Sequence, residues 1–406
     1  VILARELGPN IYGVWALVVS VATLVPFLLS MRTQFMMTKS LVNDKDNPDQ
    51  MAVHFQFLHS TNLLSYTLAG VLILVVGLLS SYIFELSSGY EMLFVIVSAT
   101  AFFRSLDPTW ISITRNEKSF ILLAVSQLLH TLPFFLWVLA CKVWIGFELT
   151  TLAWGYVLGG GIGWTLRFVY VRKTIRSQYG FHLNWFGFLD FFKLKEKAGP
   201  MWQEAKPVYL GTMFETLPRN LDNVLLGFFQ ASSAVAIFRT ASVLIRGVGK
   251  LVKPLNRVLF QDFARLLKKD REAELRTAIK SYLLFSAPTL LIAFLTLAYF
   301  MEEVVLFVYG DAYREAVGSM LFLLPGVYFS FVLFWTKTYA IAKGMTSEFQ
   351  KSMAWAATVF VLLGSVAASV YGPEGVAAAS SGALVFQQCW LAIQIWWAKS
   401  DSLRSD

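Results

Sequence analysis

Three charged residues stand inside one apolar stretch, "FETLPRNLDNVLLGFF" (214–229). Glu215, Arg219 and Asp222 are spaced four and three residues apart, so they share one face of a helix. Acids and bases on one face can pair with each other or hold an ion. Pro218, next to Arg219, removes a backbone hydrogen bond and is expected to break the helix locally. This stretch is therefore predicted to hold a polar site rather than a plain membrane anchor.

The following apolar stretch adds three cations on one helical face. Arg239, Arg246 and Lys250 are spaced seven and four residues apart, and Arg219 lies roughly 20 Å along its own span, near the membrane midplane. Four such residues facing lipid would cost about 10–14 kcal/mol, comparable with the net stability of a whole domain. They must face protein or water. Glu215 and Asp222 can neutralise only two of them, so the spacing predicts a wet cationic cavity that suits an anion.

Three further charges lie nearer to the ends of apolar stretches: Arg104, Asp107 and Lys337. A structural ion pair or a side chain that reaches the interface explains them as well as a functional role does. Arg104 is kept as a candidate anion ligand, and Asp107 joins Glu215 and Asp222 as a candidate for ion coupling or ion pairing. The two cysteines and four histidines have no metal-ligand spacing, and we expect no metal, cofactor or catalytic group.

The composition is that of a membrane protein. Of the 406 residues 56% are hydrophobic and 15% charged, with a mean hydropathy of +0.59, whereas soluble domains carry about 25% charged residues. Apolar runs of about 20 residues, the length of a membrane-crossing helix, recur along the chain. An all-α polytopic membrane protein is predicted, with eleven spans near 11–31, 61–84, 90–111, 118–141, 149–171, 206–230, 234–259, 281–308, 316–343, 350–371 and 375–398.

The net charge of +8 reflects membrane topology rather than nucleic-acid binding. One set of alternate loops holds most of the lysines and arginines, including those of the 172–206 segment, whereas the opposite set holds only Arg5, Lys142 and Arg314. Loops rich in these residues stay in the cytoplasm. The asymmetry therefore predicts a cytoplasmic C-terminus and an outer loop at 300–316.

The chain divides at its longest basic segment. Residues 1–171 hold five spans and, because the sequence opens at Val1 without a methionine, the expected tail of a missing first helix. A cytoplasmic basic linker at 172–205 follows, and 206–406 holds six spans. Outer junctions in the two halves echo one another, as in "YIFELSSGYEMLF" and "VLFVYGDAYREAV". Such echoes favour a duplicated six-helix unit.

Four motifs, in this order, resemble those of one family: "ARELGPNIYGVWAL", "LDNVLLGFFQASSAVAIF", "LFVYGDAYREAVGSMLFLLP" and "YGPEGVAAASSGALVF". The family is the bacterial oligosaccharide-lipid (Wzx-type) flippases, polysaccharide biosynthesis proteins of the multidrug/oligosaccharidyl-lipid/polysaccharide (MOP) exporter superfamily. The likeness covers essentially the whole chain. One departure is Phe238, where the family often has tyrosine.

The resemblance implies two six-helix bundles that rock about a central cavity by alternating access. It also implies transport of undecaprenyl-diphosphate-linked oligosaccharide from the cytoplasmic to the periplasmic leaflet of the bacterial inner membrane, for surface polysaccharide. Basic cavity residues would meet the diphosphate, and Arg219, Arg239, Arg246 and Lys250 stand at suitable places. Membrane lipid is an expected partner, with a polymerase and other polysaccharide-assembly proteins as further candidates.

Two alternatives remain open at this stage. A drug or metabolite cation antiporter of the same superfamily would need acids to bind its cation, which the cationic stripe disfavours. A membrane glycosyltransferase or polymerase would need catalytic residues, usually in a sizeable extramembrane loop, whereas the outer connections left between the predicted spans have roughly ten residues at most.

The predicted topology can be tested by cysteine labelling. In a chain without its two native cysteines, Ser405→Cys should resist an impermeant thiol reagent added outside intact cells, because the C-terminus is predicted to be cytoplasmic. Asp311→Cys, in the predicted outer loop, should react and serves as the positive control. Labelling of Ser405→Cys from outside would contradict the topology.

Overall fold

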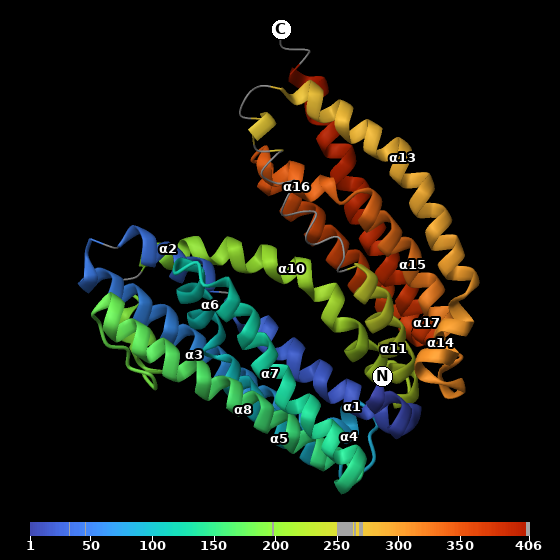
Figure 1. The fold of residues 1–406 in the computed structure, drawn as a ribbon, viewed down its shortest axis with the longest axis horizontal. Coiled ribbons are helices and arrows are strands. Elements are labelled where there is room, and N and C mark those ends of the chain that lie inside the picture. The colour runs from blue at the N-terminus through green and yellow to red at the C-terminus, as the bar shows by residue number, and fades with distance from the viewer. Residues whose placement is uncertain are drawn as a thin grey trace. The chain divides into compact units, whose positions relative to one another are not determined.

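The computed structural model describes residues 1–31, 33–44, 46–196, 199–249, 263, 265–267 and 271–402. Every regular element in these ranges is a helix (Figure 1), which confirms the all-α prediction. The elements are α1 (Ile2–Leu29), α2 (Gln34–Asn43), α3 (Pro48–Leu78), α4 (Ser80–Ile83), α5 (Glu91–Arg104), α6 (Asp107–Asn116), α7 (Phe120–Ala140), η1 (Cys141–Ile145), α8 (Leu149–Thr174), η2 (Ile175–Tyr179), α9 (Asp190–Leu194), α10 (Gly199–Phe229), α11 (Ser232–Gly249), α13 (Glu272–Tyr299), α14 (Met301–Tyr309), η3 (Asp311–Tyr313), α15 (Ala316–Val332), α16 (Trp335–Ala342) and α17 (Thr346–Ser402).

Six helical segments in the described ranges are long and apolar enough to cross a membrane: Ile2–Leu29, Pro48–Leu78, Glu91–Asn116, Ile121–Ile145, Glu272–Tyr299 and Thr346–Trp397. A seventh arises if α15 and α16, bent by 43°, form one span. The last segment covers two predicted spans, which meet at the non-helical backbone of Gly372. Helices α8, α10 and α11 also coincide with predicted spans. They are less apolar because α8 is rich in glycine and the other two carry charged residues.

The chain packs into two compact units. We call residues 18–213 the N-terminal unit, and residues 1–17 together with 214–406 the C-terminal unit. Both boundaries fall within helices, one in α1 and one in α10. The first seventeen residues therefore belong to the same packed body as the last part of the chain. The division at the basic linker 172–205 stays a prediction of sequence reasoning.

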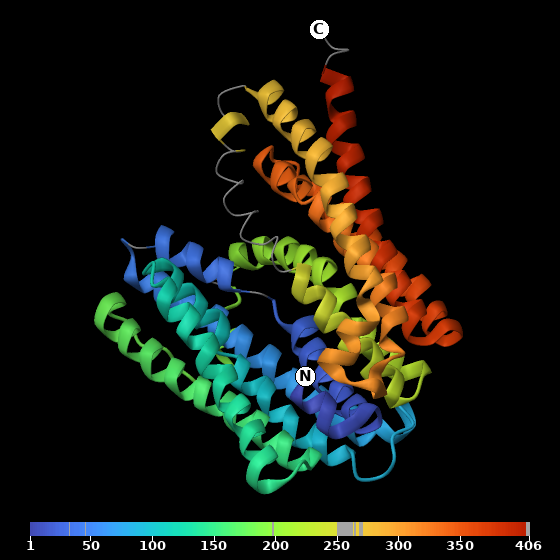
Figure 2. The ribbon, with the colours of Figure 1, turned by 45° about the vertical axis from the view of Figure 1, so that its right-hand side comes forward.

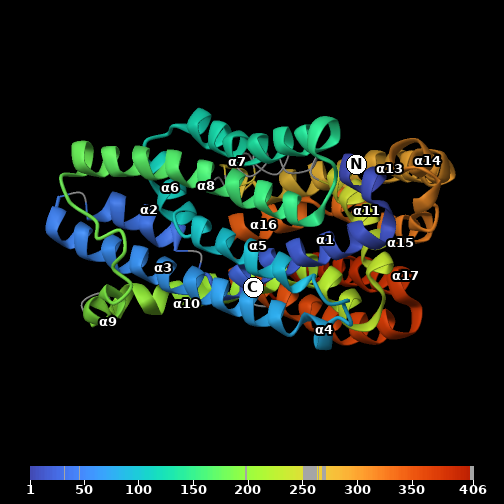
Figure 3. The same ribbon diagram turned by 90° about the horizontal axis from the view of Figure 1, so that it is seen from below.

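In the N-terminal unit, α3, α5, α8 and α7 pack on one another in that order. Figure 3 shows α7 and α8 running side by side. At one end of these helices α2 and α6 pack together around a core that includes Met37, Phe55 and Phe57, all fully buried. This packing fixes the positions of Arg104 at the end of α5 and Asp107 at the start of α6.

In the C-terminal unit, α15 lies at the centre and contacts α11, α13 and α17. Helices α15 and α17 lie side by side in both Figure 1 and Figure 2. A buried cluster around Trp335, Tyr339 and Leu391 joins α16 to α17. Helix α11, which carries the predicted cationic face, is held by α15 and α17.

The N-terminal segment is tied to the C-terminal unit by several specific contacts. Gly8 has φ of +69°, which L residues with a side chain rarely adopt, and it kinks α1. Before this kink, the Arg5 guanidinium donates to the carbonyl oxygens of Phe307 and Val308. The Tyr313 hydroxyl donates to the Ala4 carbonyl oxygen at 2.8 Å, and burial raises the pKa of Tyr313, which keeps this donor protonated. These bonds explain several residues of the "ARELGPNIYG" motif.

Large apolar side chains cover the outer surface of α13. Leu284, Phe285 and Ile292 are 71%, 73% and 67% exposed. A water-soluble protein rarely leaves such a surface open, whereas hydrocarbon accepts it without cost. The chain is a multi-pass membrane protein, and this face of α13 is suited to lipid.

Gly13 provides a test of how the N-terminal segment docks. A Cβ at this position would lie 1.7 Å from the backbone oxygen of Ser232 at the start of α11. Gly13→Ala must push the two segments apart, and we expect it to lower the stability of the detergent-solubilised protein by about 1–3 kcal/mol. Thermal unfolding measures the change.

Gly247→Ala is the matched control, since a Cβ there meets nothing within 4 Å. It should be neutral or slightly stabilising because alanine is the better helix former. Equal melting temperatures for Gly13→Ala and the parent would show that the close approach is not part of the stable fold.

Candidate functional site

Arg246 on α11 forms an ion pair with Asp222 on α10. The two residues are 24 positions apart and meet because α10 and α11 are joined by a short turn. The Asp222 side chain is fully buried and that of Arg246 is 26% exposed. Asp222 also accepts a 2.8 Å hydrogen bond from the Asn223 backbone N–H. The acid is therefore fully engaged, while the arginine keeps a partly open side.

Arg239, two turns earlier on α11, has a different kind of partner. Its guanidinium lies near the Tyr12 hydroxyl on α1 and interacts with it electrostatically. The Tyr12 ring packs edge-on against the Tyr313 ring with centroids 6.4 Å apart. The centroid of the Tyr309 ring lies 5.8 Å from that of Tyr313. Among the side chains that the structure describes, Arg239 forms no ion pair. Within the described residues, its positive charge contacts a neutral phenol and pairs with no acid.

The two arginines lie on one side of α11, seven positions apart, which is about 10 Å of helical rise. An arginine offers five N–H donors in a planar fork that matches the oxygens of a phosphate. Tyr12 can use only part of this capacity on Arg239, and the Arg246 side chain is 26% exposed. Helix α11 can therefore present two oriented anion ligands in series.

A second charged cluster lies within the N-terminal unit. Asp107 at the start of α6 accepts a hydrogen bond from Arg167 on α8 and interacts with Arg104 at the end of α5. Arg104 also hydrogen-bonds to the Tyr156 hydroxyl. Arg167 is only 8% exposed and donates a further bond, 3.3 Å long, to the Ser126 carbonyl oxygen. Two cations thus share one acid in this cluster.

Lys337 lies over the Phe349 ring, with its Nζ 5.1 Å from the ring centroid. A cation above an aromatic face is stabilised by the ring quadrupole. This contact joins α16 to the start of α17 and favours the structural reading of Lys337.

Three predicted site residues cannot be placed. The side chains of Glu215 and Arg219 and the whole of Lys250 lie outside the described residues. Pro218 lies within α10, whose helix is continuous from Gly199 to Phe229, and a break at Pro218 stays a prediction. In the described ranges, no group of three or more histidine, cysteine or acidic residues has the arrangement of a metal site.

Sequence reasoning overlooked two residues of these clusters. Arg167 lies inside the predicted span 149–171, and a single arginine five residues from the end of a span reads as one that reaches the interface. Tyr12 belongs to the "LGPNIYG" motif but is not charged. One sequence signal could have found Arg167 and a partner for Arg239. An arginine inside a membrane span costs free energy, so each one is expected to have a partner.

The fold is one that membrane transporters of the MOP superfamily share. A multidrug resistance MATE family transporter of that superfamily, in an inward-facing conformation, matches with a TM-score of 0.74 at 14% identity, covering 98% of this chain and 93% of that one. The lipid II flippase MurJ, inward closed, matches with a TM-score of 0.71 at 15% identity, covering 97% and 83%. The Vibrio cholerae MATE transporter VcmN, in its bent form, matches with a TM-score of 0.56 at 12% identity, covering 98% and 90%.

The sequence narrows this class to one family. The Polysaccharide biosynthesis protein family (Polysacc_synt_3) matches residues 2–318, and the chain belongs to it. No curated protein matches the sequence significantly. The expected superfamily is confirmed by the family and by the fold together.

Asp107 provides a test of the cluster in the N-terminal unit. Asp107→Asn would leave the buried Arg167 without its acidic partner, and we expect a loss of stability on the order of 2 kcal/mol, since Asp107 itself is partly exposed. Adding Arg167→Gln should restore part of the loss by removing the stranded charge. Asp311→Asn, which breaks an exposed surface pair, is the control and should leave the melting temperature unchanged. A stable Asp107→Asn variant would show that the pair carries little energy.

Proposed function

We propose that the chain is a flippase that moves a polyprenyl-diphosphate-linked oligosaccharide from the cytoplasmic to the periplasmic leaflet of the bacterial inner membrane. The product would feed the synthesis of a surface polysaccharide such as O-antigen, capsule or exopolysaccharide. Membership of the polysaccharide biosynthesis family supports this proposal. So does the likeness in fold to a protein described as a lipid II flippase.

The observation that carries the proposal is the state of Arg239. It lies in a helix that coincides with a predicted span, and within the described residues its charge has no acidic partner. An unbalanced cation at such a position is costly unless it serves an anion or faces water. A diphosphate offers several oxygens for bidentate hydrogen bonds to guanidinium groups.

The contacts of Arg239 and Arg246 indicate how each arginine would be positioned to bind the diphosphate. Tyr12 orients Arg239 without neutralising it, so its remaining N–H groups can bind phosphate. Asp222 orients Arg246 in the same way, although it also lowers the net charge there. In the predicted topology a diphosphate coming from the cytoplasm would meet Arg246 and then Arg239 along α11. Lys250, which follows this helix in the sequence, is proposed as a further ligand. Arg219 and Arg104 are proposed as further ligands.

The contacts of the acids weigh against cation antiport. A carboxylate that binds a transported cation must be available to it. Asp222 is fully buried against Arg246, and Asp107 is shared by Arg104 and Arg167. Both of these carboxylates already interact with arginines. Among the described candidate residues, the arginines are therefore better placed to bind an anion than the acids are to bind a cation.

Substitutions on α11 test the proposal in a flippase-deficient strain. Arg239→Gln should reduce surface-polysaccharide output at unchanged protein abundance, because a charge-assisted contact contributes roughly 1.5–3 kcal/mol, or about tenfold or more in affinity. Arg239→Lys should restore output only in part, since lysine offers a point charge without the bidentate fork. Arg246→Gln would leave the fully buried Asp222 without its partner, so it is combined with Asp222→Asn to keep the protein folded. This variant should lower output likewise. The triple variant with Arg219→Gln, Arg239→Gln and Arg246→Gln, also carrying Asp222→Asn, should abolish output.

Arg314→Gln is the matched control, because it removes an exposed arginine from the predicted outer loop. It should complement the strain fully. Full complementation by the triple variant would mean that these arginines are not needed for transport, and the mechanism of diphosphate binding on α11 would have to be abandoned.

A further inference from the structure

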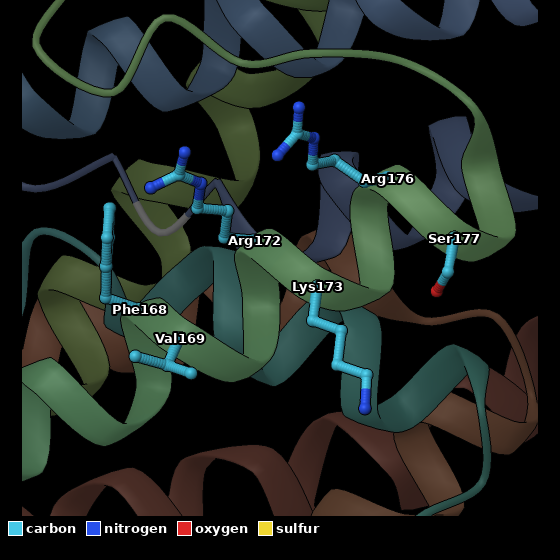
Figure 4. A pocket seen from close by; sticks show the side chains of 6 residues that line it. All are labelled: Phe168, Val169, Arg172, Lys173, Arg176 and Ser177. Carbon is cyan, nitrogen blue, oxygen red and sulfur yellow. The ribbon is translucent and has the colours of Figure 1, made fainter.

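The C-terminal end of α8, with the π-helical turn η2 that follows it, carries a pocket of about 500 Å³. Phe168 and Val169 line its apolar part, and Arg172, Lys173 and Arg176 line its basic part. Figure 4 shows Phe168, Arg172 and Arg176 extending from one side of the helix, one turn after another, and Lys173 extending from the other. The pocket thus changes from apolar to cationic along the helix.

A second hollow of about 150 Å³ adjoins the first, since Arg172 and Arg176 line both. Its other wall is the segment 181–185, which folds back along α8 after Gly180 adopts φ of +72°. Phe181 and Leu183 anchor this segment in the core of the N-terminal unit. The two arginines therefore lie between a helix and a fixed wall, which distinguishes them from basic residues on an open loop.

The charges of this site are not neutralised by acids in the part of the chain that the structure describes. Within the described residues, Arg172, Lys173 and Arg176 form no ion pair. Aromatic side chains border the apolar part. The Phe168 ring stacks on the Trp164 ring with centroids 5.1 Å apart, and it meets the Trp185 ring edge-on with centroids 4.9 Å apart. Aromatic residues of this kind typify the boundary between hydrocarbon and headgroups.

The predicted topology puts the site at the cytoplasmic surface of the membrane. The predicted span ends at residue 171, so Phe168 and Val169 lie at the depth of the acyl chains, and Arg172 and Arg176 at the depth of the phosphates. We propose that this site binds the phosphate group of an anionic phospholipid of the cytoplasmic leaflet, with an acyl chain along Phe168 and Val169. The ligand chemistry is a phosphate diester joined to an apolar chain, and transport activity is not needed for this binding.

Binding of short-chain lipids to the purified full chain in detergent tests the proposal. Dioctanoyl phosphatidylglycerol should bind about tenfold more tightly than dioctanoyl phosphatidylcholine, whose headgroup carries no net charge. The double variant Arg172→Gln/Arg176→Gln should lose most of this preference, with its affinity for phosphatidylcholine unchanged. Higher salt should weaken binding of the anionic lipid in the parent.

Lys193→Gln/Lys195→Gln is the matched control. It removes two charges from the same basic linker, outside both hollows, and should keep the full preference. Thermal unfolding confirms that each variant is folded. A preference for phosphatidylglycerol that survives in the double arginine variant, or that is lost equally in the control, would refute the proposed lipid site. Displacement of the lipid by an equal concentration of inorganic phosphate would assign the site to free phosphate and refute the lipid assignment.

Discussion

A charge held away from water must find a partner, and this constraint governs the arrangement of the polar residues in the chain. The cost of a lone arginine inside a membrane is a few kcal/mol, which few proteins can bear repeatedly. Three solutions occur within the described residues. Arg246 has a buried acid, Arg104 and Arg167 share one acid, and Arg239 has only a phenol. In the third solution, the positive charge of Arg239 has no acidic partner within the described residues, and the proposed function depends on this charge.

The N-terminal segment has a direct part in this arrangement. Gly8 kinks the first helix, Gly13 permits close approach to the start of α11, and Tyr12 between them reaches Arg239. Arg5 and Tyr313 fix the same segment through backbone carbonyls. The residues of the "LGPNIYG" motif are thus explained by local geometry. Gly8 allows the kink, Gly13 lets the backbone come close to Ser232, and the tyrosine orients the arginine without cancelling its charge.

Much of this could be predicted from the sequence, because apolar length and helical spacing are local properties. The helical class, the positions of the spans and the shared face of Arg239 and Arg246 all follow from them. Pairings between distant residues do not. Asp222 was expected to neutralise one of four cations, but helical spacing could not say which. It binds Arg246, 24 residues away, because a turn brings α11 against α10. The span expected at 90–111 contains a helix break between Arg104 and Asp107. Arg167 and Tyr12 were missed because each acts through a tertiary contact.

The central claim is that Arg239 recognises the diphosphate of the lipid-linked substrate, and direct binding tests it most simply. Affinities for undecaprenyl diphosphate and for undecaprenol are compared by native mass spectrometry, in a background carrying Arg172→Gln/Arg176→Gln so that the surface site does not contribute. The account predicts that the diphosphate binds about tenfold more tightly than the alcohol, and that Arg239→Gln removes most of this difference while Arg239→Lys keeps part of it. An Arg239→Gln variant that discriminates between the two lipids as well as the parent does would contradict the claim.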